Sequence, residues 1–185
     1  MSWALEAGYR HIDTAAFYGN EKDVGRAIKK SGILRSEIFV TTKVMNLLSP
    51  ERAFYRSLEN LDLGYIDLYL VHFPIPLLKR RAWKILEKIC KNGQVKAIGV
   101  SNYSAKQLKQ LLEYAEVPPA VNQVEFSPFF CRKKLLDYCM SKGIFVEAYS
   151  PLTHGQRLGN DVIGELATKY GKSSAQIMIR WSLFH

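Results

Sequence analysis

The chain has 185 residues, 48% hydrophobic and 23% charged, a composition typical of a globular protein and unlike that of a disordered or fibrous one. Lys and Arg number 26 against 17 Asp and Glu, and the net charge of +9 favours an acidic partner such as a phosphorylated cofactor. The basic residues are scattered along the chain, which argues against nucleic-acid binding, and no apolar run is long enough to cross a bilayer.

The amino terminus and the cysteines indicate a cellular compartment. The first residues have neither the basic nor the apolar segment of a secretory signal. Cys90, Cys131 and Cys139 show no CxxC spacing, so we expect free thiols in a reducing compartment and no metal site. The sequence therefore predicts a cytoplasmic protein.

Six short runs with the residue types of β-strands alternate with helical patterns. They begin at intervals of about 25 to 29 residues, which fits one strand and one crossover helix. Helices are predicted to begin at Asn20 and Glu21, at Ser49 with Pro50, and after Ser104, and two more helical segments fill residues 160–185. The predicted strands start near Arg10 (this one running to Ala15), Ile38, Ile66, Val95, Ala120 and Phe145.

This alternation predicts an α/β protein with a parallel sheet, either an open doubly wound sheet or a (β/α) barrel. An open dinucleotide-binding sheet usually has a glycine-rich turn after its first strand, and no GxGxxG occurs here. Polar residues instead stand at the carboxyl end of every predicted strand, and a barrel gathers all such ends at one mouth. The barrel is therefore favoured. The polar residues are Asp13, Lys43, His72, Ser101 with Asn102, Gln123 with Glu125, and Tyr149 with Ser150.

Three of these residues, Asp13, Lys43 and His72, would form acid–base machinery if they met Tyr18 at the mouth. A phenol with its ordinary pKa of about 10 is a poor proton donor at neutral pH, and a nearby ammonium group lowers that pKa. Lys43 can supply the ammonium to Tyr18, Asp13 can hold Lys43 in place, and His72 can orient a carbonyl oxygen toward the phenol. Taken singly, each residue has a simpler explanation, as a turn cap, a surface lysine or a core histidine. Together they predict a site that reduces a C=O group.

The hydride for such a reduction has to come from a cofactor. Ser101, Asn102 and Gln123 can hydrogen-bond a nicotinamide carboxamide, and Tyr149 can stack on its ring. Asn102 taken alone is equally typical of a turn or a helix cap.

The sequence resembles the aldo-keto reductases over nearly its whole length. The blocks GYRHIDTAAFYGNEKDVG, VTTK, LVHFP, VKAIGVSNYS, NQVEFSPF and AYSPL occur in the order and spacing of that family. The resemblance implies a (β/α)8 TIM barrel that uses NADPH to reduce aldehydes or ketones to alcohols, and a monomer.

Residues that match the family's motifs receive roles from the same resemblance. Tyr18 matches the acid, Lys43 and Asp13 its tuning pair, and His72 the residue that orients the substrate. Phe17 and Phe73 match positions that line the substrate pocket, and many members have Trp in place of Phe73. The implied cofactor contacts are Ser101, Asn102, Gln123, Tyr149, Ser150 and Leu152.

The resemblance also implies missing parts. The family's first and last barrel strands have no counterpart in this chain, and the segment from Leu152 to Asn160 is shorter than the usual cofactor-covering loop. We therefore expect a single domain over residues 1–185 with about six of the eight strands, which binds NADPH weakly or not at all. The alternative is a truncated, catalytically impaired aldo-keto-reductase-like protein with a regulatory or structural role. An anion-binding or nucleic-acid-binding domain is a third possibility, resting only on net charge.

Overall fold

The computed structural model describes residues 1–184, whose backbone contacts divide into two compact units. The first unit covers Met1–Val121 and the second begins at Asn122. We describe each by itself.

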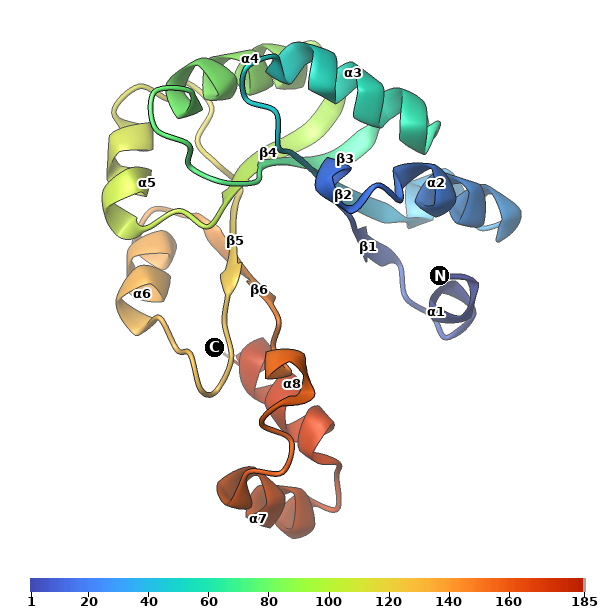
Figure 1. The fold of residues 1–185 in the computed structure, drawn as a ribbon, viewed down its shortest axis with the longest axis vertical. Helices are drawn as coiled ribbons and strands as arrows, with labels where there is room; N and C mark the ends of the chain where they lie inside the picture. Colours follow the sequence, from blue (N-terminus) through green and yellow to red (C-terminus); the bar gives the residue numbers. More distant parts are fainter. Residues whose placement is uncertain (185) are drawn as a thin grey trace. The chain divides into compact units, whose positions relative to one another are not determined.

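The first unit is built on four parallel strands in the order β1-β2-β3-β4 (Figure 1). Its register places Asp13 beside Thr41, and Lys43 beside Leu70. Helix α3 packs on β2, and α4 packs on β3 and β4. The elements are α1 (Ser2–Glu6), β1 (His11–Asp13), η1 (Ala16–Tyr18), α2 (Glu21–Lys30), η2 (Arg35–Glu37), β2 (Phe39–Val44), α3 (Pro50–Leu61), β3 (Ile66–Val71), α4 (Lys79–Lys91), β4 (Val95–Ser101) and α5 (Ala105–Leu112).

The second unit contains β6 and all of β5 except its first residue, Val121, and these two strands are neighbours in the sheet order. Helix α6 packs against β6, and α7 packs against α8. The elements are β5 (Val121–Glu125), α6 (Lys133–Ser141), β6 (Phe145–Tyr149), η3 (Thr153–Gly155), α7 (Asp161–Tyr170) and α8 (Ser174–Phe184).

The core of the first unit lies along β2 and β3. All six residues of β3 are buried, as are five of the six in β2, which is the pattern of strands covered on both faces. Tyr69 of β3 packs edge-on against Phe54 of α3 with ring centroids 5.2 Å apart, so Tyr69 faces the helical layer. Because Thr42 is the register partner of Tyr69, Thr42 shares that face, and Lys43 points to the opposite one.

The close packing of α2 on α3 depends on one glycine. A Cβ built on Gly25 would lie 1.9 Å from the backbone oxygen of Leu61, so no larger residue fits without moving a helix. Gly25 belongs to the same signature block as Asp13 and Tyr18. The block therefore contains a residue required for packing as well as predicted site residues.

The predicted elements are confirmed closely. Each of the six strands begins within one residue of its predicted start, and Ser104 caps α5 through a capping box with Gln107. The first strand ends at Asp13 rather than at Ala15, because the chain turns into η1 after one further bond from Thr14 N to Thr41 O (2.9 Å). Helix α1 was not predicted, since five residues are too few to show a helical period.

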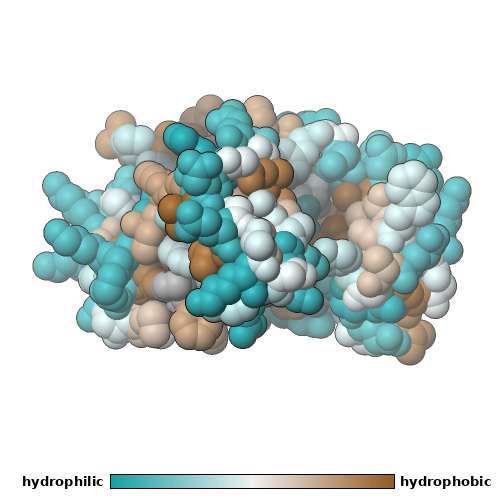
Figure 2. All heavy atoms as spheres, turned by 90° about the horizontal axis from the view of Figure 1, so that it is seen from below, coloured by the Kyte–Doolittle hydropathy of each residue, from teal (hydrophilic) through white to brown (hydrophobic). Residues whose placement is uncertain are grey.

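The surface mixes hydrophobic and hydrophilic residues over the face drawn in Figure 2. Within residues 1–184, no helix combines the length and the apolar character needed to cross a membrane.

Candidate active site

The first unit brings together the four predicted catalytic residues. Asp13 ends β1, Lys43 stands one residue before the end of β2, and His72 directly follows β3. Tyr18 is the last residue of η1, the short 3-10 helix after β1. Parallel strands end at one edge of the sheet, which is why residues about 30 positions apart in sequence meet there.

Lys43 is held at this edge although its side chain is fully buried. Its Nζ donates to Asp13 Oδ1 (2.5 Å) and to the backbone oxygen of Thr14 (2.8 Å). A buried ammonium group is tolerated only when paired and hydrogen-bonded, and both conditions are met. The simpler explanation of Lys43 as a surface lysine is therefore wrong.

Tyr18 lies near both the lysine and the histidine. The amine of Lys43 is 5.4 Å from the centre of the Tyr18 ring, and the Tyr18 and His72 rings are edge-on with centroids 6.1 Å apart. The tyrosine side chain remains half exposed. Gly19, in the left-handed region at φ 68°, ends η1 immediately after it and allows the sharp change of direction into α2.

His72 is buried within an aromatic group. Its ring stacks on Phe73 with centroids 4.7 Å apart and an interplanar angle of 14°, and it meets Phe17 edge-on at 6.4 Å. Burial and the Lys43 ammonium lower the pKa of His72 below 6.5, and Asp13 opposes this only in part. The imidazole is therefore neutral at pH 7, with one nitrogen able to donate a hydrogen bond and the other able to accept one.

Two of the predicted cofactor residues lie beside His72. Ser101 ends β4, and Asn102 follows it with a left-handed backbone at φ 65°. Asn102 Nδ2 donates to the backbone oxygen of His72 (3.2 Å) and to Ser101 Oγ (3.0 Å). The interpretation of Asn102 as a turn residue and its interpretation as a site residue are thus compatible.

The other predicted cofactor residues belong to the second unit. Gln123 on β5 is buried and donates to Glu147 Oε1 (2.7 Å). Tyr149 ends β6, and Ser150 and Leu152 follow it in a loop where Ser150 has a positive φ of 51°. Burial, with Glu125 nearby, raises the pKa of Tyr149. Their cofactor role stays a prediction.

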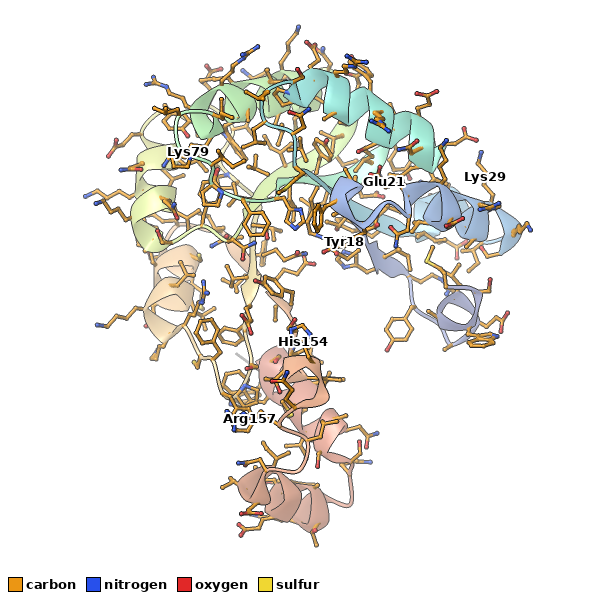
Figure 3. All side chains as sticks on the ribbon, viewed as in Figure 1. Tyr18, Glu21, Lys29, Lys79, His154 and Arg157 are labelled. Carbon is orange, nitrogen blue, oxygen red and sulfur yellow. The ribbon has the colours of Figure 1, made fainter. Side chains whose placement is uncertain are left out.

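The sequence did not reveal the hydrogen-bonded group formed by Glu21, three residues after Tyr18. The Glu21 carboxyl is buried and accepts from the hydroxyl of Thr42 (2.8 Å) and from Asn60 Nδ2 (3.3 Å). Figure 3 shows Glu21 between the segment that carries Tyr18 and α3. Nothing in the sequence separates Glu21 from an ordinary acidic residue in the first turn of a helix.

Comparisons with known proteins show the family of this chain. Residues 1–185 match the aldo/keto reductase family, and the chain belongs to that family. It is 49% identical to a glyoxal reductase of Bacillus subtilis over 186 residues, covering 98% of this chain and 67% of that protein. It is 43% identical to methylglyoxal reductase DkgA of Escherichia coli over 186 residues, covering 97% of this chain and 68% of that protein.

Solved structures show the same fold. An aldo-keto reductase enzyme from a Medee basin deep-sea metagenome library matches with a TM-score of 0.93 and 47% identity, over 98% of this chain and 70% of that one. A Bombyx mori aldo-keto reductase, solved in complex with NADP, matches with a TM-score of 0.91 and 39% identity, over 97% and 67%. The predicted membership of the aldo/keto reductase family and the barrel-type fold with six strands are thereby confirmed.

Proposed function

We propose that this chain reduces small aldehydes and 2-oxoaldehydes to alcohols with NADPH, with Tyr18 as the proton donor. The observation that carries the proposal is the buried Lys43 amine, held by Asp13 within 5.4 Å of the Tyr18 ring centre. A fixed cation beside a phenol stabilises the phenolate that remains when the proton has left. This arrangement supports proton donation to a carbonyl oxygen.

His72 contributes orientation rather than charge. A neutral imidazole can donate one hydrogen bond to the carbonyl oxygen without competing with Tyr18 for the proton. Its Nδ1 is buried with no hydrogen-bond partner among residues 1–184, and its ring is fixed by the stack on Phe73. Phe17 and Phe73 provide apolar walls for the rest of a small substrate, in keeping with their predicted role.

Tyr18 regains from solvent the proton that it gives to the substrate. The Tyr18 hydroxyl gives its proton to the carbonyl oxygen as the carbonyl carbon is reduced, and the product is the alcohol. Because Tyr18 is 51% exposed, water can return a proton to the phenolate. NADPH, when bound, supplies the hydride for this reduction.

The polar residues present fit a nicotinamide carboxamide. Ser101 and Asn102 offer hydroxyl and amide groups at the carboxyl end of β4, one hydrogen bond away from the His72 backbone. We propose that these two residues bind the carboxamide. Gln123, Tyr149, Ser150 and Leu152, which belong to the second unit, stay predicted cofactor contacts.

The substrate class follows the relatives. The Bacillus subtilis relative is named a glyoxal reductase and the Escherichia coli relative a methylglyoxal reductase, so we infer small dicarbonyls as substrates here. We also infer a monomer that binds no nucleic acid and acts in the cytoplasm. The last inference is supported by the three free cysteines.

The test is NADPH oxidation followed at 340 nm with glyoxal and methylglyoxal. We expect Tyr18→Phe to lower kcat at least about 100-fold, the size of a lost general acid. Tyr9→Phe is the matched control, because Tyr9 is exposed and lies outside the site. Equal turnover by the Tyr18→Phe and Tyr9→Phe proteins would contradict the proposal.

A further inference from the structure

The segment that carries Tyr18, residues 14–21, is tied at both ends to consecutive residues of β2. We call this segment the tyrosine loop. At its start, the backbone oxygen of Thr14 accepts from Lys43 Nζ (2.8 Å). At its end, Glu21 Oε1 accepts from the hydroxyl of Thr42 (2.8 Å). The loop is thus anchored to opposite faces of one strand.

The second oxygen of Glu21 reaches a different element. Asn60 of α3 donates to Glu21 Oε2 (3.3 Å), so the carboxyl joins the tyrosine loop to a strand and to a helix at once. Glu21 is only 4% exposed, and within residues 1–184 it forms no ion pair with a Lys or Arg. A buried carboxyl in this position depends on its hydrogen-bond donors.

Packing gives the loop little support on its outer side. An open cavity of about 840 Å³ borders Ala16, Phe17 and Gly19 and extends to Ser49 and Arg56 of the α3 region. Side chains therefore do not fill the space between η1 and the α3 region. A hydrogen bond from Thr14 Oγ1 to Asn20 Oδ1 (2.6 Å) closes the loop on itself, and the hydrogen bonds of Glu21 connect its end to β2 and α3.

We propose that Glu21 is a positioning residue for the reaction: through Thr42 and Asn60 it holds the phenol of Tyr18 at its place beside Lys43. The inference rests on the proposed function of Tyr18. The proposal adds that Glu21, which is not one of the four predicted catalytic residues, fixes the position of the Tyr18 phenol.

Two substitutions at one buried position test it. Thr42→Val removes the hydroxyl but keeps the shape, whereas Thr42→Ser keeps the hydroxyl and removes a methyl group. We expect Thr42→Val to lower kcat about 10- to 100-fold with KM changed less than about threefold, because small misplacements of reacting groups are costly. Thr42→Ser should stay within about threefold of the wild type. A role in packing alone predicts the reverse order, since Val suits a buried strand better than Ser.

A second readout does not depend on turnover. Amide hydrogen exchange over residues 15–19 should speed up at least about 10-fold in Thr42→Val and Glu21→Gln, and not in Thr41→Val, whose hydroxyl contacts His11 instead. Unchanged exchange in Thr42→Val, or equal kcat losses in Thr42→Val and Thr42→Ser, would overturn the positioning role. A wild type without turnover would refute the proposed function, and the exchange result would still decide whether Glu21 restrains the loop.

Discussion

The amine of Lys43 is sealed from solvent and lies 2.5 Å from Asp13 Oδ1, whereas the Asp13 side chain keeps a third of its surface exposed. The pair therefore joins a fully desolvated cation to a partly solvated anion. Such a pair is costly to break from the anion side, because the cation is left without its counter-charge in the interior.

Asp13→Asn should therefore destabilise the protein by about 2 kcal/mol, somewhat less than a fully buried pair would lose. Urea unfolding measures this change. Asp23→Asn is the matched control, because Asp23 pairs with Arg26 on the surface, where an ion pair contributes less than about 1 kcal/mol. Equal losses in the two variants would show that Lys43 finds another partner.

Gly25→Ala should destabilise the protein by at least about 1–3 kcal/mol, since its Cβ would collide with the Leu61 carbonyl and push α2 away from α3. Gly164→Ala is the control within a helix, because no atom lies within 4 Å of the added Cβ. That substitution should be neutral or stabilising by up to about 1 kcal/mol. Thermal unfolding of the two variants is the measurement, and a harmless Gly25→Ala would contradict the close approach.

Stability should depend on pH through His72. Its folded pKa lies below the unfolded value near 6.5, because of burial and the Lys43 charge, so in the window between the two values only the unfolded state takes up the proton. Stability should therefore fall as pH drops through 6.5 and level off below the folded pKa. Urea unfolding at pH 7.5 and at pH 5.5 measures the loss, which should be smaller in His72→Gln. An equal loss of stability in His72→Gln would show that other groups cause the pH dependence.

Much of the fold could be predicted because its signals are local. Proline at the first turn of α3, the Ser104–Gln107 capping box and the regular strand spacing each act within a few residues. The meeting of Asp13, Lys43 and His72 at one edge could be predicted from polar residues at strand ends, since a parallel sheet fixes where those ends meet. Their proposed roles followed from acid–base chemistry and agreed with those that the family resemblance implies.

Other parts could not be predicted because they depend on contacts distant in sequence. The Glu21 carboxyl meets Thr42 and Asn60, 21 and 39 positions away. Equally, the contact of Gly25 with Leu61 exists only once two helices have packed. A pattern read along the chain contains neither relationship.

The side chains of Thr42 and Lys43 project from opposite faces of β2. Both hydrogen bonds that anchor the tyrosine loop therefore depend on the same register of that strand. A slip of β2 by a single position would exchange those faces and remove both ties together. Misfolded molecules of that kind would then have no residual activity instead of a reduced one. The specific activity of a preparation would consequently be proportional to the fraction of molecules that folded correctly.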